Sequence, residues 1–284
     1  MLRQRLLSAA VLAPIVVLIF LTGEPWITFG VAILAMVAAH ETFRLLALAG
    51  LPGERVIGLV AAPLAVLGMA ALGHREGVIA TFVAAVLVTS AIAAFRRHVP
   101  REGFLAWAGT VVGALYVSLL AFVPAIVAVA PAIGPRAALG ELLDHGRIWL
   151  LVLVLTVWTF DTFAYFAGRT LKRGRFLDHI SPSKTWSGVI GGTVAAVIVC
   201  ALLVVGTGQH VLGGMVLGLL IAVTAQAGDV AESLLKRAAG AKDSGTLIPG
   251  HGGILDRVDS FLFAAPAMYV GLILLELTAM GGQT

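Results

Sequence analysis

The chain is built largely from apolar runs about as long as a bilayer is thick. A helix needs ~20 apolar residues to cross a hydrocarbon core of ~30 Å. Runs of roughly this length recur along the chain, at 1–22, 26–49, 56–73, 77–95, 104–130, 148–168, 187–206, 210–228 and 260–280. Hydrophobic residues make up 60% of the sequence and charged residues 12%, which is outside the range of soluble globular domains. We therefore predict an all-α polytopic integral membrane protein with about nine transmembrane helices.

Lysine and arginine are distributed unevenly between the two sides that these runs define. With the N-terminus in the cytoplasm, 16 of the 19 lie on the cytoplasmic side and only Arg75, Arg136 and Arg147 lie outside. Cytoplasmic connections are enriched in these residues. The sequence thus predicts a cytoplasmic N-terminus, an outer C-terminus, and cytoplasmic loops at 169–186 and 229–259. The first run resembles a secretory signal, but no small-residue cleavage site follows it, so we expect an uncleaved span.

Residues with chemical potential are concentrated in the second half of the chain. Residues 1–147, about five predicted spans, carry no motif of their own, whereas 148–284 form a predicted C-terminal catalytic transmembrane region. In the first region, His40, Glu41 and Arg44 lie together at the cytoplasmic end of a span. We expect a structural or headgroup-anchoring role for these three residues.

Several classes of function are disfavoured by what the sequence lacks. The net charge of +4 is spread over separate loops, which fits topology and anionic lipid better than nucleic acid. The single cysteine, Cys200, lies in an apolar run, so neither an intramolecular disulfide nor a cysteine metal cluster can form. The sequence has no phosphate-binding P-loop, no dinucleotide-binding glycine turn and no nucleophile elbow. Nucleotide binding by a P-loop or Rossmann fold and serine hydrolysis are therefore unsupported.

A polar island interrupts the apolar pattern at 229–259. Its first part places two carboxylates, a hydroxyl and two cations on one helical face at steps of three and four, namely Asp229, Glu232, Ser233, Lys236 and Arg237. Asp256 and Asp259 lie three residues apart at the expected start of the next helix, where the helix dipole stabilises carboxylates. The segment around His251 between them is rich in glycine, which lets the backbone approach a ligand closely.

The simplest alternative is a solvated loop that joins two membrane helices. Such a loop needs neither three aspartates and a histidine nor the interleaved cations Lys236, Arg237, Lys242 and Arg257. Charge of both signs around a glycine-rich turn is instead what a phosphate-binding site with a metal requires. We therefore predict that the island is the active site.

A second polar segment lies at 158–188. Asp161 and Tyr165 are four residues apart inside an apolar run and so share a helical face. An aspartate at this depth is costly unless it is functional or paired, and a hydrogen bond to a neighbouring helix is the structural alternative. Ser181 and the proline after it are typical of a helix start, which would bring Lys184 close to exposed backbone N–H groups as an anion site.

These residues resemble the signature of the phosphatidate cytidylyltransferases, also called CDP-diacylglycerol synthases. Twelve positions within 27 residues match the pattern of that family in order and spacing, namely Ser233, Lys236, Arg237, Lys242, Asp243, Pro249, His251, Gly252, Gly253, Asp256, Arg257 and Asp259. The family's Asp-x-x-x-Tyr and Ser-Pro-x-Lys-Thr stretches are matched by Asp161 with Tyr165 and by Ser181 with Lys184.

The resemblance implies that CTP reacts with phosphatidic acid to give CDP-diacylglycerol and pyrophosphate, a step of phospholipid biosynthesis. It also implies a bacterial cytoplasmic (inner) membrane location, with the active site on the cytoplasmic side and contact with membrane lipids but not with nucleic acid. We expect Mg²⁺ because the candidate ligands are hard oxygen donors, and a second cation is compatible with the same donors. The sequence leaves the oligomeric state open, a homodimer included.

Each candidate residue receives an expected role. The catalytic group comprises Asp229, Asp256, Asp259, Lys236, Arg237 and His251, and its three aspartates are the expected metal ligands. The expected substrate-binding group comprises Ser233, Lys242, Asp243, Gly252, Gly253, Arg257, Ser181, Lys184, Asp161 and Tyr165.

Two other functions remain as alternatives at this point. A CTP-dependent lipid-alcohol kinase would use the same nucleotide, but its hydroxyl nucleophile would call for a base. A membrane transporter would carry ionisable residues at mid-span depth in several helices, whereas most of those here lie at one membrane face. The aspartate-rich pattern of a CDP-alcohol phosphotransferase is missing.

Overall fold

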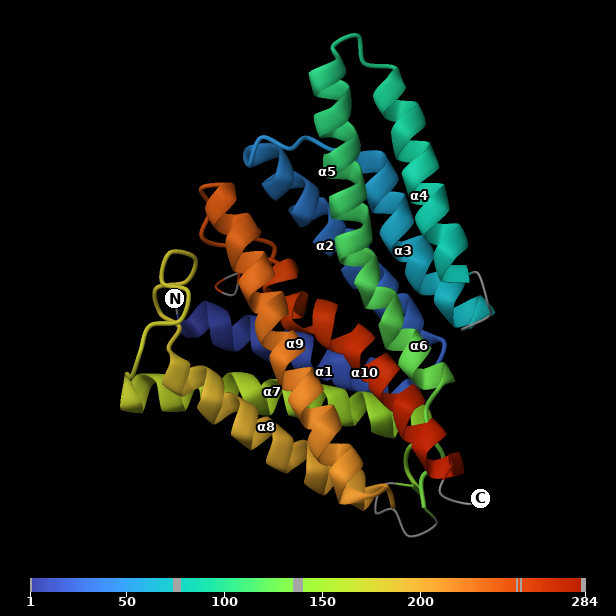
Figure 1. Ribbon diagram of the computed structural model, residues 1–284, viewed down its shortest axis with the longest axis vertical. Coiled ribbons are helices and arrows are strands. Elements are labelled where there is room, and N and C mark those ends of the chain that lie inside the picture. The colour runs from blue at the N-terminus through green and yellow to red at the C-terminus, as the bar shows by residue number, and fades with distance from the viewer. Residues whose placement is uncertain (1, 74–77, 135–139, 249, 251, 282–284) are drawn as a thin grey trace. The chain divides into compact units, whose positions relative to one another are not determined.

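The computed structural model describes residues 2–73, 78–134, 140–248, 250 and 252–281. Its regular elements are helices (Figure 1). In chain order they are α1 (Leu2–Thr22), α2 (Trp26–Leu48), α3 (Arg55–Leu72), α4 (Val78–Phe95), α5 (Pro100–Ser118), η1 (Leu119–Ala121), α6 (Phe122–Ala128), α7 (His145–Leu171), α8 (Trp186–Gly206), α9 (Val211–Ala238) and α10 (Leu255–Gly281).

Eight helices in the described part of the chain are long and apolar enough to cross a membrane, α5 to α6 counting as one. Each coincides with a predicted run, since such runs can satisfy their backbone polar groups in lipid only as helices. α9 continues beyond its run 210–228 to Ala238, and α10 begins at Leu255, before its run 260–280. The expected first span coincides with α1, of which the described apolar part is Leu12–Thr22. The all-α, multi-span prediction is therefore confirmed for eight spans. The ninth span and the sidedness of the termini remain predictions.

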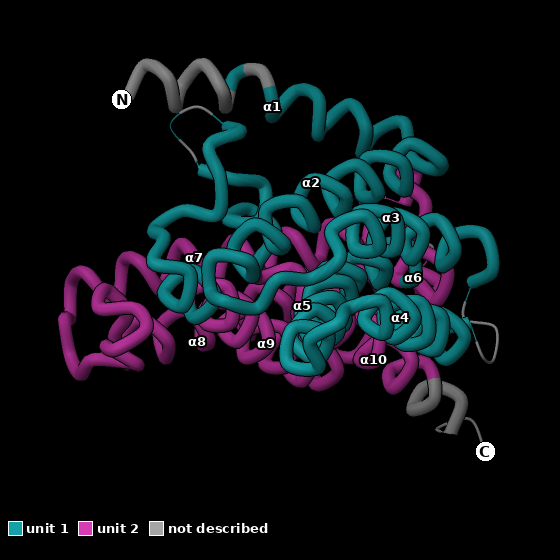
Figure 2. The backbone as a smooth tube through the Cα atoms, turned by 90° about the horizontal axis from the view of Figure 1, so that it is seen from above, with its two compact units in different colours: residues 1–125, 234–259 teal, residues 126–233, 260–284 magenta. Residues whose placement is uncertain are grey.

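The chain divides into two compact units (Figure 2). Unit 1 comprises residues 1–125 and 234–259, and unit 2 comprises residues 126–233 and 260–284. Unit 1 therefore contains the polar loop that follows α9 and the first turn of α10. The predicted catalytic role of residues 148–284 is a functional statement and remains a prediction.

In unit 1, α2 is fixed by close packing around the ring of Phe43, which is fully buried. A Cβ atom at Gly58 on α3 or at Gly113 on α5 would overlap that ring, so glycine at these positions lets the three helices approach closely. The backbone N–H of Glu54 also donates to Thr110 Oγ1 at 2.8 Å, which ties the start of α3 to α5. The last turns of α2, which carry Glu41, are thus held on two sides.

In unit 2, α7 and α8 pack together through small residues (Figure 1). A Cβ atom at Gly188 would lie 2.8 Å from the carbonyl oxygen of Ala164, and one at Gly192 would lie 2.7 Å from that of Phe160. Contact this close is the usual way in which membrane helices associate. It fixes the polar end of α8 beside the segment of α7 that follows Asp161.

The helix start predicted at Ser181 is wrong. α8 begins at Trp186, and its N-cap is Thr185, whose hydroxyl accepts a hydrogen bond from the backbone N–H of Gly188 at 3.1 Å. Thr185 satisfies an orphan donor of the first turn, which Ser181 does not reach, so the helix starts later. Lys184 accordingly lies in the loop before the helix, not in its first turn.

Candidate functional site

Helix α9 carries the apolar span and the first part of the polar island without a break. It ends with Lys236 and Arg237 in its last turn, where cations interact favourably with the helix dipole. The chain then reverses through Gly240, which has a φ of 63°, while the N–H of Ala241 donates to the carbonyl of Lys236 at 2.8 Å. This is a common helix C-cap, and it turns the chain toward the loop that precedes α10.

Asp256 is the centre of a hydrogen-bonded cluster in unit 1. Its Oδ1 atom lies 2.7 Å from Lys236 Nζ. Its Oδ2 atom lies 2.9 Å from the backbone nitrogen of Ser244, 2.8 Å from Ser244 Oγ and 2.8 Å from the backbone nitrogen of Gly253. The Lys236 and Asp256 side chains expose only 15% and 9% of their surface, so water screens this ion pair poorly. The cluster orients one aspartate oxygen toward a lysine and fixes the other with three contacts.

The glycine-rich segment before α10 is folded closely around this aspartate. Ile248 and Gly252 form an antiparallel bridge, with the N–H of Ile248 donating to the carbonyl of Gly252 at 3.0 Å. Gly252 has a φ of 85°, a backbone conformation that residues with a Cβ atom rarely adopt. Pro249 and His251 lie outside the described residues, so the expected catalytic role of His251 stays a prediction.

A second polar cluster lies in unit 2. Lys184 Nζ is 2.7 Å from Asp229 Oδ2, which connects the loop before α8 to α9. Asp161 on α7 interacts electrostatically with both Asp229 and Lys184. Their side chains are partly screened from water, with 15% of Lys184 and 33% of Asp229 exposed. The structure thus brings together three residues that the sequence had placed in two separate segments.

The remaining candidates lie at or near the surface of their units. Tyr165 is exposed, and its hydroxyl accepts a hydrogen bond from Arg169 at 2.8 Å. Arg237 donates to the carbonyl of Ala241 at 3.4 Å, and the backbone N–H of Ser181 donates to the carbonyl of Leu177 at 2.9 Å. Exposed side chains also include Lys242, Asp243 and Arg257, while Ser233 and Asp259 are half-buried.

The donor set fits a magnesium ion that phosphate oxygens help to coordinate. Mg²⁺ is usually held by one or two carboxylates together with substrate phosphates and water. Asp161 and Asp229 are two interacting carboxylates of this kind in unit 2. Within the described ranges, no group of three or more histidine, cysteine or acidic side chains forms that would hold a cation on its own. Asp256 would offer Oδ1, the oxygen beside Lys236, because three donors already contact its Oδ2.

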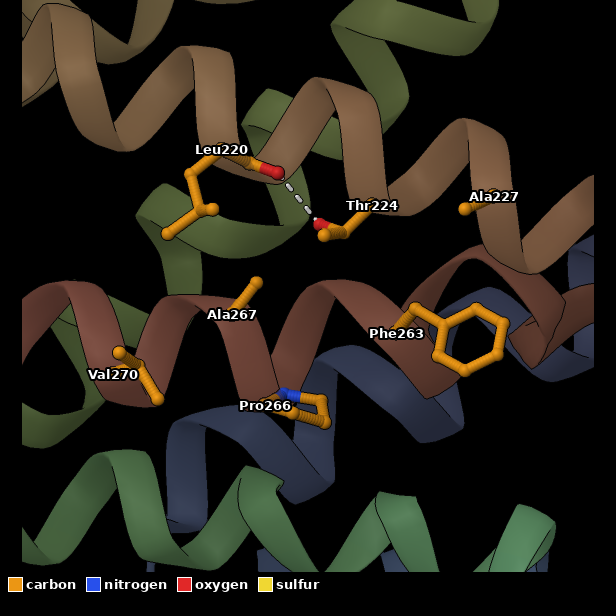
Figure 3. A pocket seen from close by; sticks show the side chains of 7 residues that line it. All are labelled: Leu220, Thr224, Ala227, Phe263, Pro266, Ala267 and Val270. Atoms are coloured by element: carbon orange, nitrogen blue, oxygen red, sulfur yellow. Dashed lines mark hydrogen bonds between the residues drawn. The ribbon is translucent and has the colours of Figure 1, made fainter.

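An apolar cavity of about 440 Å³ lies between α9 and α10 in unit 2 (Figure 3). Its polar lining residue, Thr224, donates its hydroxyl to the carbonyl of Leu220 at 2.7 Å. The other residues that line it are Leu220, Ala227, Phe263, Pro266, Ala267 and Val270. A recess of this composition suits hydrocarbon and lacks the charged groups that bind phosphate, whereas the two polar clusters contain them.

Sequence reasoning missed Ser244 and gave Glu41 only a structural or anchoring role. Glu41 is buried, with 4% of its surface exposed, and it contacts the same loop as Asp256. The signal available in the sequence was a carboxylate within the predicted apolar run 26–49, because a charged group there needs a specific partner. That partner lies 203 positions away in the sequence, so local patterns could not identify it.

Comparison with known proteins gives the family. A model of the cytidylyltransferase family matches residues 3–275. The chain is 29% identical over 280 residues to a protein of Bacillus subtilis (strain 168) named phosphatidate cytidylyltransferase, covering 96% of this chain and 98% of that protein. Proteins of the same name in Brucella abortus biovar 1 (strain 9-941) and Haemophilus influenzae are 48% identical over 128 residues and 39% identical over 129 residues. The chain spans about half the length of these last two, 47% and 44%.

The long apolar helices, together with similarity to such bacterial proteins, define a multi-pass membrane protein. The chain belongs to the cytidylyltransferase family, because the family model matches almost its whole length. The resemblance inferred from the polar island is therefore confirmed.

Proposed function

We propose that the protein transfers the cytidylyl group of CTP to phosphatidic acid. Membership of the cytidylyltransferase family and similarity to the Bacillus subtilis protein along nearly the whole chain support this reaction. The observation that carries the proposal is a pair of lysine–aspartate contacts, each of 2.7 Å, between Lys236 and Asp256 and between Lys184 and Asp229. Lys236 and Asp256 both lie in the polar island, and the contact of Lys184 with Asp229 joins the second polar segment to that island.

The reaction itself needs little covalent help from the protein. A phosphate oxygen of phosphatidic acid attacks the α-phosphorus of CTP and forms a new P–O bond. The bond from the α-phosphorus to the bridging oxygen breaks, and pyrophosphate leaves with the electron pair. A phosphomonoester has a second pKa of ~6, so the nucleophile is already ionised at neutral pH and no general base is required. The demands that remain are positioning and charge neutralisation.

The two ion pairs meet these demands by exchanging partners. In each pair, the lysine ammonium can turn from its aspartate to a phosphate oxygen, while the aspartate carboxylate turns to a cation. A bound Mg²⁺ would supply neutralisation of the triphosphate and stabilisation of the leaving pyrophosphate. We assign Asp229, Asp256 and Asp259 to metal binding. In unit 2 Asp161 accompanies Asp229, in unit 1 Asp259 accompanies Asp256, and a second cation is compatible with these donors. Before substrate arrives, the pairing keeps each half-buried charge compensated.

The other candidate residues surround the substrates in this proposal. We propose that the exposed cations Arg237, Lys242 and Arg257 bind the triphosphate and the lipid phosphate. His251 would donate a hydrogen bond to a phosphate oxygen. The remaining substrate-binding candidates are those that the family resemblance implies, namely Ser181, Ser233, Asp243, Gly252, Gly253 and Tyr165. Arginine suits this role because its planar fork can bind a phosphate through two hydrogen bonds.

The active site is proposed to face the cytoplasm, where CTP is found. Support comes from the 16 of 19 lysine and arginine residues that a cytoplasmic N-terminus places on that side. The location proposed is a bacterial cytoplasmic membrane, where the lipid substrate is present within the bilayer. A homodimer remains compatible with this arrangement.

The purified protein tests the proposal directly. It is assayed in detergent with CTP, phosphatidic acid and Mg²⁺, and both the lipid product and the released pyrophosphate are quantified. We expect one CDP-diacylglycerol for each pyrophosphate, and no product when Mg²⁺ is chelated. Release of CDP together with a phosphorylated lipid alcohol, when a lipid alcohol replaces phosphatidic acid, would support a kinase and overturn the proposal.

A further inference from the structure

Glu41 on α2 makes three contacts with the segment that carries Asp256. Its Oε2 lies 2.8 Å from the backbone nitrogen of Leu255 and 3.0 Å from Ser244 Oγ, and its Oε1 lies 3.1 Å from the backbone nitrogen of Ile254. Leu255 is the first residue of α10. The first N–H groups of a helix have no partner within the helix, and a carboxylate there is stabilised by the helix dipole. Glu41 thus caps α10 from another helix.

The loop is shaped to admit this carboxylate. A Cβ atom at Gly253 would overlap both carboxylate oxygens of Glu41 and Ser244 Oγ, and one at Gly245 would overlap Glu41 Oε1. The absence of a side chain at Gly253 therefore leaves space for the Glu41 carboxylate. The sequence had suggested only that glycines here let the backbone approach a ligand. Because α2 is itself packed around Phe43, Glu41 is a fixed reference point for the loop.

Ser244 links Glu41 to Asp256 directly. Its hydroxyl oxygen lies 3.0 Å from Glu41 Oε2 and 2.8 Å from Asp256 Oδ2, and it accepts a bond from the backbone N–H of Asp256 at 3.3 Å. A hydroxyl has one proton to donate, so it can serve only one of the two carboxylates at a time. A change at Glu41 therefore alters the hydrogen bonding of Asp256 without touching it.

We infer that Glu41 is a positioning residue of the proposed reaction, which holds Ser244 and the first turn of α10 so that Asp256 directs its Oδ1 toward Lys236. The inference rests on the proposed function, because Asp256 is a proposed site residue. Groups that orient a metal ligand or catalytic carboxylate commonly change metal affinity or activity by roughly 10–100-fold when they are removed. A residue that only packed two helices together would affect stability instead.

The test uses Glu41→Gln, which keeps the size of the side chain but replaces one acceptor oxygen by an NH₂ group. That group would face a backbone N–H or Ser244, so at least one of the three contacts is lost. The matched control is Glu54→Gln, also in unit 1, because Glu54 forms an exposed ion pair with Arg97 at 2.6 Å. Surface ion pairs of this kind contribute little to the free energy of unfolding.

Two readouts are measured on each purified variant. The first is amide hydrogen exchange of residues 253–257 without CTP or metal, which reports on the cap itself. The second is turnover per folded molecule, with KM for CTP and the Mg²⁺ concentration at half-maximal rate. For Glu41→Gln we expect faster exchange, a roughly 10–100-fold lower kcat/KM and a raised Mg²⁺ midpoint, and for Glu54→Gln no change in any of these.

A Glu41→Gln protein with faster exchange but wild-type kcat, KM and Mg²⁺ midpoint would overturn the inference and leave Glu41 as a helix cap alone. Ser244→Ala and the double variant of Glu41→Gln with Ser244→Ala test whether Glu41 acts on Asp256 through Ser244. If it does, the effects of the two substitutions are less than additive, and full additivity would exclude transmission through Ser244. If Glu41→Gln does not fold, Glu41→Asp is measured by the same readouts and criteria. An inactive wild type would refute the proposed function, an outcome distinct from an active wild type with an unaffected variant.

Discussion

Lys236 Nζ lies 2.7 Å from Asp256 Oδ1, which joins the last turn of α9 to the first turn of α10. The pair spans the glycine-rich loop between the two helices, and 20 positions separate its members in the sequence. Because the side chains are largely shielded from water, loss of either partner leaves the other charge poorly compensated. The contact therefore holds the two ends of the loop together, and in the proposed site each of its partners compensates the charge of the other.

Asp256→Asn is expected to abolish turnover and raise the Mg²⁺ requirement. It is also expected to lower stability by about 1–3 kcal/mol, because hydrogen bonds to a charged acceptor are replaced by weaker ones. Mg²⁺ titration of the rate and thermal unfolding in detergent measure the two effects. Asp178→Asn is the control, since the contact of Asp178 with Arg175 at 3.8 Å is exposed. Wild-type turnover with an unshifted Mg²⁺ midpoint would contradict the metal assignment.

The contact between Lys184 and Asp229 is expected to couple the two residues in catalysis. Lys184→Met and Asp229→Asn should each lower kcat/KM, and their double-mutant cycle should give a coupling energy of about 0.5–3 kcal/mol. Lys172→Met is the matched control, because Lys172 is an exposed cation in the same loop. Independent effects of the two substitutions would show that the contact has no part in transition-state stabilisation.

Arg237→Lys tests how the triphosphate is held. Lysine keeps the charge but lacks the planar fork, so loss of one charge-assisted hydrogen bond of about 1.4 kcal/mol should raise KM for CTP about 10-fold. Steady-state kinetics measure this change, and Arg173→Lys, an exposed arginine outside the candidate set, serves as the control. An unchanged KM would leave Arg237 with its structural contact to the carbonyl of Ala241.

Membrane sidedness is expected to differ between two connections. Reporter fusions at Gln209, between α8 and α9, and at Gly245, between α9 and α10, should lie on opposite sides, with Gly245 in the cytoplasm. The reason is the excess of lysine and arginine on the side that includes the N-terminus. Finding both reporters on the same side would refute the topology.

Much of the fold follows from local physics that a sequence displays. α2 and α8 begin and end within one residue of the predicted runs 26–49 and 187–206, since apolar segments in lipid must be helical. The helix that carries the first part of the polar island was equally predictable from its spacing, since α9 runs to Ala238. The start of α8 was not, because Thr185 provides the cap that Ser181 was expected to introduce.

Partner choice within the site could not be predicted. Periodicity placed Asp229, Lys236 and Asp256 on helix faces, but which lysine pairs with which aspartate depends on how distant segments pack. The contacts of Glu41 with Ser244 and with the start of α10 likewise join residues more than 200 positions apart. Neither composition nor spacing reports contacts of this range.

The fate of the phosphates of CTP tests the central claim most directly. The protein is incubated with phosphatidic acid, Mg²⁺ and CTP labelled at either the α- or the γ-phosphate, and the lipid and aqueous products are separated. Cytidylyl transfer predicts that the α-label enters the lipid and the γ-label is recovered in pyrophosphate. Recovery of the γ-label in lipid, or of the α-label in soluble CDP, would contradict it.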